Sequence, residues 1–474
     1  MTVLPTTLGQ YGRQARTILG APRFWCMVFF AVASQYFVFV PPASAADVPP
    51  SLVAPAPSFV TDDLWTRSYL FGDWAGSRPA LHNLGIDVTL TGVEEAGMNL
   101  SGGPRQTAQQ AGQLTLQADF DLQKSLGLEG GSFLMTLIGR WGRNLAADAG
   151  IPALQLIDEV YGRGNIVRLE EFAYKQKLFG GLIEIKLGRL AVSDDFFFSS
   201  CDFLNLTFCG GQPGNIAGNY IYNWPLSQWA AVGKLNFGSQ GYVQSAVYDS
   251  NPAYLATTPN IALLPSFPAG SQGVLLPFEL GWTPKLGSLA GVYKLGGWYN
   301  SDAAPNVATS LNGEPILVSG LPALPGRGRS GVYLSLEQQL TYDPSSGDAR
   351  NGLSTFFNTA FADRRTSTLD YQIAWGVKQH GLWTSRPQDE IGLAVGTTQV
   401  NPAIANAQAL ANSLGTGPGY TQRNEYEMEV WYGWQATGWL NLKFDAQYII
   451  SPGGYTSQTN HNALVLGGRT SVFF

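Results

Sequence analysis

The last fifty residues of the chain alternate between apolar and polar side chains with a period of two. Over 426–434 apolar or aromatic residues occupy the even positions, and acidic residues occupy the first odd ones: Glu425, Glu427 and Glu429. The alternation resumes over 439–450 and 463–474. Because successive side chains of an extended strand point to opposite faces, each run predicts a β-strand with one apolar face and one polar face.

The same alternation recurs along the chain and predicts an even number of strands. The sixteen predicted strands cover 88–97, 113–122, 132–141, 166–177, 182–190, 228–237, 241–249, 277–283, 290–300, 330–340, 353–361, 369–378, 389–398, 424–434, 439–450 and 463–474. Connections after even-numbered strands are mostly short, whereas those after odd-numbered strands are mostly long: 142–165, 191–227, 250–276, 301–329 and 399–423. Such asymmetry is typical of bacterial outer-membrane barrels, whose turns are periplasmic and whose loops are extracellular.

The fold prediction is therefore all-β: a 16-stranded antiparallel transmembrane β-barrel over 88–474, with extracellular loops that fold partly inward. Three short helices are predicted as well. Ser77 would cap one, with Pro79 in its first turn and Gly85 as its stop. The other two lie in loops, over 403–414 and 151–160.

Composition distinguishes the predicted barrel from a soluble β-sandwich, whose strands also alternate between apolar and polar residues. Charged residues make up 13% of the chain, against roughly 25% in soluble domains. Aromatic residues make up 12%. A protein with so few charges hides much of its outer surface from water, and lipid is the simplest cover.

The first 45 residues are predicted to be an export signal. Arg13, Arg16 and Arg23 precede an apolar run over 24–40, and Ala43-Ser44-Ala45 is a small-residue cleavage site. The alternative is a single transmembrane anchor. Residues 46–87 then form a Pro/Ala-rich linker and the short periplasmic helix. The net charge of −6 becomes more negative once the signal is removed, which argues against nucleic acid as a partner.

Two of the three cysteines remain after the signal is removed. Cys201 and Cys209 lie eight positions apart, and an exported protein favours a disulfide over free thiols. A bridge over so short a loop stabilises by roughly 2–3 kcal/mol and holds a loop rather than the fold. No metal site or cofactor is expected, because the histidines are far apart in sequence: His82, His380 and His461.

Catalytic motifs are not found in the sequence. It contains no nucleophile elbow, zinc-protease helix motif or phosphate-binding glycine loop. Asp194 and Asp195 are the nearest approach to a glycosidase pair, but neighbouring residues of a strand point to opposite faces. The chain is therefore not predicted to be an enzyme.

Four segments resemble the carbohydrate-selective porin family of the OprB type. They are Phe71-Gly72-Asp73-Trp74-Ala75-Gly76-Ser77-Arg78 followed by Leu84-Gly85-Ile86, Lys186-Leu187-Gly188-Arg189-Leu190 leading to Asp194-Asp195-Phe196, Leu206-Thr207-Phe208-Cys209-Gly210, and 446–454 followed by 463–467. Ala75 departs from the pattern, where the family commonly has a second glycine. The resemblance implies passive diffusion of small sugars through a charged and aromatic constriction formed with inward loops.

Two alternatives remain open beside the sugar channel. One is a general small-solute porin or an outer-membrane channel for non-sugar cargo, and the other is a secreted carbohydrate-active enzyme. The expected partners of the sugar channel are small carbohydrates as permeants, outer-membrane lipid and the barrel assembly machinery. Phe474, at the end of the last strand, resembles the signal that this machinery reads.

Pore residues follow from the resemblance and from strand parity. By resemblance Arg189 is the first candidate, and Asp194 and Asp195 reach the same zone. Parity places five further charged residues on inward faces: Arg140, Glu171, Glu427, Lys443 and Asp445. The alternative is that most of these pair with neighbours across the wall. Arg189 is in phase with outward apolar residues, so it faces the lumen only if a bulge near Gly188 turns it.

Overall fold

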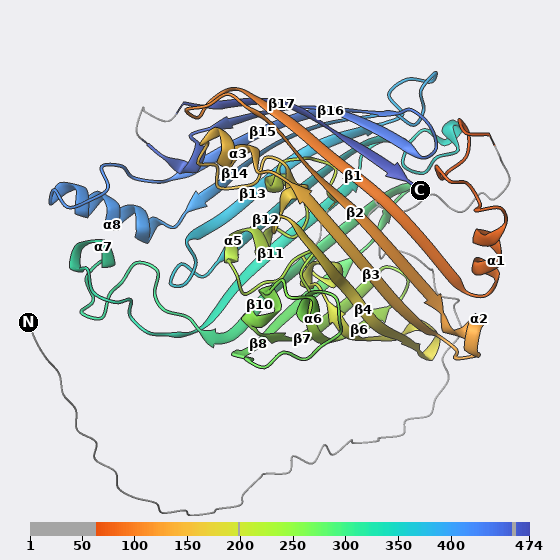
Figure 1. The fold of residues 1–474 in the computed structure, drawn as a ribbon, viewed down its shortest axis with the longest axis horizontal. Helices are drawn as coiled ribbons and strands as arrows, with labels where there is room; N and C mark the ends of the chain where they lie inside the picture. Colours follow the sequence, from red (N-terminus) through yellow and green to blue (C-terminus); the bar gives the residue numbers. More distant parts are fainter. Residues whose placement is uncertain (1–62, 198–199, 457–460) are drawn as a thin grey trace, which may run out of the picture. The chain divides into compact units, whose positions relative to one another are not determined.

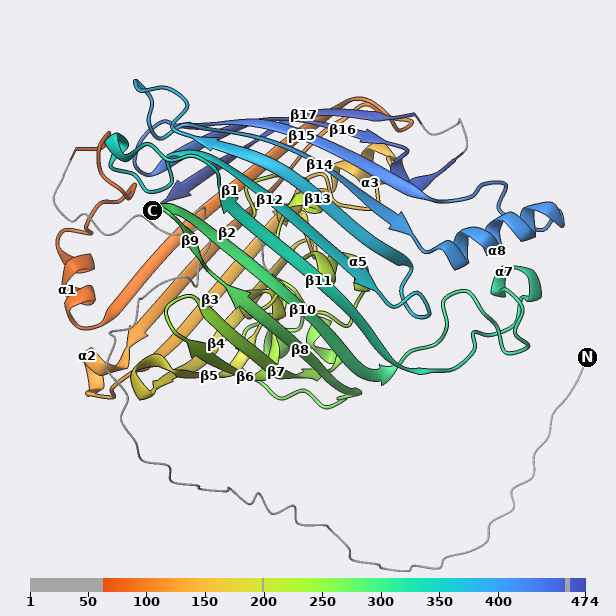
Figure 2. The same cartoon turned by 180° about the vertical axis from the view of Figure 1, so that it is seen from behind.

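The computed structural model describes residues 63–197, 200–456 and 461–474. The predicted export signal and most of the linker lie outside these residues, and all that follows concerns the unit Pro42–Phe474. In this unit the strands form one antiparallel sheet that closes on itself, because the last strand pairs with the first, with Thr91 opposite Phe473 (Figures 1 and 2). The closed sheet confirms the predicted barrel.

The barrel has sixteen long strands, and a two-residue strand, β9, lies in the turn between two of them. The strands are β1 (Ile86–Ser101), β2 (Ala108–Asp121), β3 (Gly131–Gly142), β4 (Ile166–Leu178), β5 (Ile183–Leu190), β6 (Gln228–Phe237), β7 (Gly241–Ser250), β8 (Gly273–Trp282), β9 (Lys285–Leu286), β10 (Leu289–Ala303), β11 (Arg327–Gln339), β12 (Gly352–Ala362), β13 (Leu369–His380), β14 (Glu390–Val400), β15 (Asn424–Gln435), β16 (Leu440–Ile450) and β17 (Ala463–Phe473). Every predicted strand is therefore present.

The outward faces of the strands are apolar and the inward faces are polar. On β15, Met428 and Val430 are exposed while Glu429 between them is fully buried. This is the reverse of a soluble protein, where exposed positions are polar and buried ones apolar. The alternation is the arrangement of an outer-membrane barrel whose apolar band faces outward.

Two of the predicted helices differ from the structure. The helix α1 (Ser77–Asn83) begins one residue earlier than predicted: its cap position is Gly76, without a side-chain cap, so Ser77 is helical. No α-helix covers 151–160, and only its last two residues lie in a 3-10 helix, η1 (Glu159–Tyr161). Asn144 instead caps α3 (Leu145–Ala149), and Gly150 ends it in the left-handed conformation. The predicted helix over 403–414 is confirmed as α8 (Pro402–Ser413).

The remaining helices are short and lie in the connections. They are α2 (Leu122–Leu126), η1 (Glu159–Tyr161), η2 (Phe179–Gly181), α4 (Val192–Asp195), η3 (Leu206–Phe208), α5 (Gln212–Ala217), η4 (Pro252–Leu255), α6 (Pro259–Ala262), α7 (Ile316–Ser319), η5 (Pro344–Ser346) and η6 (Pro452–Gly454). Within the three described ranges, no helix has the length and apolar character needed to cross a membrane.

The segment before β1 covers the end of the last strand, where the barrel closes. Leu70 donates its backbone N–H to the carbonyl of Phe473 at 2.7 Å. The buried Arg78 of α1 donates to the Phe474 carbonyl at 2.7 Å and lies over the rings of Tyr69 and Trp74. The N-terminal segment therefore joins the two ends of the sheet.

Two long loops occupy the interior of the barrel. In both ribbon views α5 lies within the ring of strands (Figures 1 and 2), and Ile216 of α5 belongs to one apolar cluster with Trp298 and Tyr333 of the wall. Leu145 and Ile157 of the loop 143–165 pack against Val465 of β17. The loops 143–165 and 191–227 therefore narrow the lumen.

Candidate pore and constriction loops

The two inward loops are joined to each other by backbone hydrogen bonds. Glu159 donates its N–H to the carbonyl of Leu204, and Leu206 donates to Leu156, both at 2.9 Å. These pairs link one loop to the other in the manner of a short ladder. The two loops therefore form one body across the lumen, which we call the constriction loops.

Carboxylates of β15 hold the constriction loops against the wall. Glu429 accepts the backbone N–H groups of Leu204 and Asn205 at 2.7 and 2.9 Å. Four residues away, Glu425 accepts that of Leu154 at 2.8 Å. A carboxylate that accepts backbone N–H groups makes strong, charge-assisted bonds. This strand therefore anchors both loops.

Arg469 on β17 is the cation at the centre of this anchor. Its guanidinium donates to Glu95 of β1 at 2.8 Å and lies 3.0 Å from the carboxylate of Glu159. It also donates to the carbonyls of Cys201 and Phe203 at 3.0 and 3.2 Å. One buried side chain thus joins two strands to both constriction loops.

The loop 191–227 contains the predicted disulfide, and Cys201 and Cys209 are joined in the structure. Among the described residues, the one group of side chains close enough to hold a metal ion is formed by Glu159 with these two cysteines. The disulfide removes both thiolates, so this group does not fit a metal.

Two lysines of the wall bind the residue next to the disulfide. The ammonium of Lys378 lies 2.5 Å from Asp202 and 3.0 Å from Glu337, and Lys443 donates to the carbonyl of Asp202. Burial raises the pKa of the Asp202 carboxyl, but the charges of Lys378 and Lys443 outweigh it and hold that pKa below its usual value. The loop is therefore bound to β13 and β16 by ion pairs and hydrogen bonds.

Three predicted pore residues lie in this anchor rather than at an open surface. Lys443 contacts Asp202 and the ring of Trp431, Asp445 accepts from Gln447 at 2.9 Å, and Glu427 is buried between the two anchoring glutamates. All three face inward as parity predicted. The constriction loops, however, cover them.

Glu171 faces a second group of charges, on the inner side of β4 and β5. Lys186 of β5 lies 2.9 Å from Glu171 and 3.3 Å from Asp195. A register shift between β3 and β4 inserts Glu170 as a bulge, so that both Glu170 and Glu171 are buried inward. This bulge explains why strict alternation did not indicate Glu170.

The side chains of Asp194 and Asp195 have different partners, although the two residues are adjacent in sequence. Asp194 accepts the backbone N–H of Ala191 at 3.2 Å, within its own short helix. Burial and the charge of Glu171 raise its pKa to about 7. Asp195 turns toward Lys186 instead. Neither aspartate accepts a hydrogen bond from Arg189, which donates to backbone carbonyls instead.

Arg189 lies in the outward phase of β5. No register shift occurs at Gly188, and Arg189 stands opposite Phe172 and Trp229, which are outward residues of β4 and β6. Its guanidinium donates to the carbonyls of Ser227 and Leu264. The structure therefore follows strand parity, and Arg189 is not part of the constriction described next.

The constriction loops meet the wall at Arg140 and Gln113. Arg140 donates to Gln113 at 2.6 Å and to the carbonyl of Gly162 at 2.7 Å. Trp224, from the end of the other loop, donates its indole N–H to the same Gln113 at 3.2 Å. Arg163 next to Gly162 is exposed, and Trp224 is partly exposed. Donors, acceptors and an aromatic face therefore converge here.

Sequence reasoning had named Arg140 but not Gln113, Trp224 or Arg163. Parity indicates Gln113 as an inward residue of β2, but not that it receives two donors. Trp224 and Arg163 lie in loops, where no periodic signal exists. Arg469 was also missed as a site residue, although its place on the polar face of the last strand was visible.

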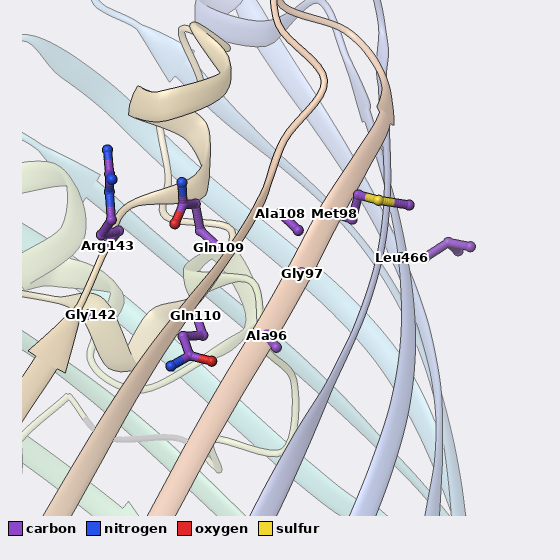
Figure 3. A pocket seen from close by; sticks show the side chains of 9 residues that line it. All are labelled: Ala96, Gly97, Met98, Ala108, Gln109, Gln110, Gly142, Arg143 and Leu466. Carbon is purple, nitrogen blue, oxygen red and sulfur yellow. The ribbon is translucent and has the colours of Figure 1, made fainter.

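A shallow cavity of about 680 Å³ lies apart from these residues. It is lined by Ala96, Gly97, Met98, Ala108, Gln109, Gln110, Gly142, Arg143 and Leu466, and Met98 and Leu466 project on the same side of β1 and β17 (Figure 3). Met98 and Leu466 are exposed residues of the outward rows. The cavity is thus not the pore.

The closed barrel with an apolar exterior and a polar, loop-narrowed interior defines the class of outer-membrane porins. Within that class the chain belongs to the OprB family of carbohydrate-selective porins, whose model matches residues 105–474. Members of this family are channels.

Individual relatives agree with this assignment. The chain is 37% identical to Porin B of Pseudomonas aeruginosa, over 86% of this chain and 91% of the relative. It is 31% identical to the putative porin QuiX of Acinetobacter baylyi, over 83% and 91% of the two chains. The high-pH structure of Pseudomonas putida OprB matches with a TM-score of 0.82 and 35% identity, over 87% of this chain and all of that one.

Proposed function

We propose that small neutral sugars diffuse through this barrel along a polar constriction formed by Arg140, Gln113, Trp224 and Arg163. The observation that carries this proposal is the convergence of both constriction loops on Arg140 and Gln113. Guanidinium and amide groups exchange hydrogen bonds with sugar hydroxyls, and an indole face stacks on the apolar face of a pyranose ring.

The anchoring of the loops supports a fixed aperture. A passive pore selects by size and by hydrogen bonding only while its narrowest part keeps its shape. Here the loops are held by the carboxylates of Glu425 and Glu429, by Arg469 and by Lys378. In this proposal the predicted residues Glu427, Lys443 and Asp445 belong to the anchor, and Glu171, Asp194 and Asp195 belong to the wall and loop around Lys186.

The remaining parts of the proposal concern export and assembly. We infer that the signal is cleaved after Ala45, that the outward apolar rows contact outer-membrane lipid, and that the assembly machinery reads Phe474 before the N-terminal segment covers it. The last point is supported by the contact of Arg78 with the Phe474 carbonyl.

The proposal is tested by current through single channels in planar bilayers, with a monosaccharide added to one side. Arg140→Gln is expected to raise the half-blocking sugar concentration roughly tenfold, because a hydrogen bond from a charged group contributes about 1.5–3 kcal/mol. The matched control is Arg143→Gln, three positions along, whose side chain is exposed and pairs with Asp148. Equal sugar block in Arg140→Gln and the parent protein would contradict the assigned constriction.

The same measurement separates the alternative functions. A conductance that sugars do not reduce indicates a general small-solute porin or a channel for other cargo. An absence of conductance together with sugar hydrolysis indicates an enzyme.

A further inference from the structure

The barrel wall is short at β5. β5 has 8 residues, whereas its neighbours β4 and β6 have 13 and 10. A strand that crosses the apolar band of a membrane needs about 9–11 residues. The ladder between β4 and β5 stops at Phe172 and Arg189, so that residues 166–171 of β4 extend past the end of β5. The wall therefore has a notch toward its extracellular end.

A segment of the next extracellular loop fills this notch. We call residues 251–268, which include η4 and α6, the strap. Arg168 of β4 donates to the carbonyls of Tyr254 and Leu255 at 2.8 and 2.9 Å. Tyr254 is buried, and α6 contacts β4, beside which it lies in Figure 1. The strap thus bridges from β7 back to β4, past the ends of β6 and β5.

The strap also covers the outward side of β5 and β6 near these ends. Arg189 and Trp229 stand opposite each other in the outward row that continues from Leu187. Arg189 donates to the carbonyl of Leu264 at 3.3 Å and lies 4.8 Å from the ring centre of Tyr254. Trp229 stacks on Phe267 with ring centres 4.0 Å apart, and its indole N–H donates to Ser266 at 2.9 Å.

The outer surface of the strap is apolar. Phe267 is 74% exposed and Leu264 53%, and the outward residues Leu187 of β5 and Val167 of β4 are exposed as well. Val167 lies beyond the end of the β4–β5 ladder, so the exposed apolar wall continues past the level of Arg189. The strap is thus continuous with the apolar wall on both sides of the notch.

We propose that the strap is a membrane-embedded part of the barrel wall, and that Leu264 and Phe267 contact the hydrocarbon of the outer leaflet. A guanidinium at this place would otherwise face lipid, which is costly. The strap supplies the Leu264 carbonyl and the ring of Tyr254 to Arg189 on its inner side and apolar side chains on its outer side. This inference rests on the lipid contact of the outer wall proposed above. In this proposal Arg189 is a positioning residue, which holds the strap against the wall.

The test uses spin labels on the full protein taken from the outer membrane and placed in phospholipid vesicles. Single cysteines replace Leu264 or Phe267, and the accessibility of each label to oxygen and to a water-soluble nickel chelate is measured. Leu187→Cys is the control for the lipid-facing wall. Leu317→Cys in α7 is the control for an exposed loop residue. The protein without an added cysteine gives the background.

Labels at 264 and 267 are expected to match the label at 187, with high oxygen and low nickel accessibility. If they match the label at 317 instead, the strap lies in water and the proposal is overturned. Low accessibility to both reagents means that protein covers the strap, as a second copy of the chain would, and this also overturns it. If the label at 187 is itself accessible to nickel, the lipid contact of the wall fails, independently of the strap.

Arg189→Gln tests the inner side of the strap. Loss of the charged donor is expected to shift the label at 267 toward nickel accessibility, while sugar block of the current stays as in the parent protein. Arg105→Gln, an exposed arginine on another extracellular loop, is the matched control and should shift nothing. An unchanged label at 267, or an altered sugar block, would contradict the positioning role of Arg189.

Discussion

The barrel is narrowed on its inside and completed on its outside by loops that are held in different ways. The constriction loops are bound to β17 and β1 through buried ion pairs, with Arg469 between Glu95 and Glu159, and to β15 through carboxylates that accept backbone N–H groups. The strap is bound to β4 and β5 by arginines that donate to backbone carbonyls, and its free side is apolar. Groups of both signs stabilise a loop where the surroundings are polar, whereas Arg189, which binds the strap from the outward row of β5, is covered by the strap.

This comparison predicts that breaking an inner ion pair disturbs the channel more than any other change. Arg469→Ala would leave Glu95 buried without its cation and would remove an anchor that holds both constriction loops to β17 and β1. Removing one partner of a buried pair destabilises by about 3–5 kcal/mol. Single-channel recordings should show a larger, noisier conductance and loss of sugar block.

The control for Arg469 is Arg365→Ala, which breaks an ion pair with Asp363 in which both side chains are partly exposed. Exposed pairs contribute about 0–1 kcal/mol. A quiet, parent-like conductance in Arg469→Ala would contradict the anchoring role.

The joint at the barrel ends should give the next largest effect. Deleting Phe474 is expected to lower the fraction of the protein that is assembled in the outer membrane. Arg78→Ala should lower the temperature at which the folded barrel, the compact band in SDS gels, converts to the unfolded form. The Arg78→Ala variant loses the two hydrogen bonds and the two cation–π contacts of the guanidinium. Each cation–π contact contributes about 0.5–2 kcal/mol.

The readout for this joint is gel migration of boiled and unboiled samples. A closed barrel leaves no open sheet edge, and the parent protein should therefore migrate differently in the two states. Identical migration of the parent samples would argue against a detergent-resistant barrel. An unchanged yield without Phe474 would argue against its role in assembly.

The disulfide is expected to have a smaller effect than Arg469. Replacing Cys201 and Cys209 by alanine removes roughly 2–3 kcal/mol of loop stabilisation, but Arg469 still binds the carbonyl of residue 201 and Lys378 still binds Asp202. Proteolysis within 200–210 should become faster while sugar block persists. Loss of sugar block in this variant would show that the bridge, and not the ion pairs, keeps the aperture.

The smallest expected effect is a pH dependence of the short helix α4. Burial and Glu171 raise the pKa of Asp194 to about 7, above its usual value of about 3.9. The protonated form is therefore favoured in the folded loop, so that stability of α4 decreases as the pH rises from about 4 to about 7. Amide exchange over 191–196, corrected for its intrinsic pH dependence, should be faster at high pH. Asp194→Asn should remove the difference.

The sequence by itself determined the strands, their outward faces and the alternation of short turns with long loops. These depend on a period of two that each strand carries within its own residues, so Met428 and Val430 could be assigned without knowing their neighbours. The disulfide was also predictable, because Cys201 and Cys209 are close in sequence. Family resemblance then indicated the function that the comparisons support.

Only the tertiary structure decided which inward residues line the pore. Whether Glu429 faces a permeant or an amide depends on Leu204, which is more than two hundred positions away and carries no periodic signal. The bulge at Glu170, the burial of Arg189 under Leu264 and the meeting of Trp224 with Gln113 are likewise products of loop packing. Strand periodicity is a local property, whereas a constriction is formed by contacts between segments that the chain brings together only when the barrel closes.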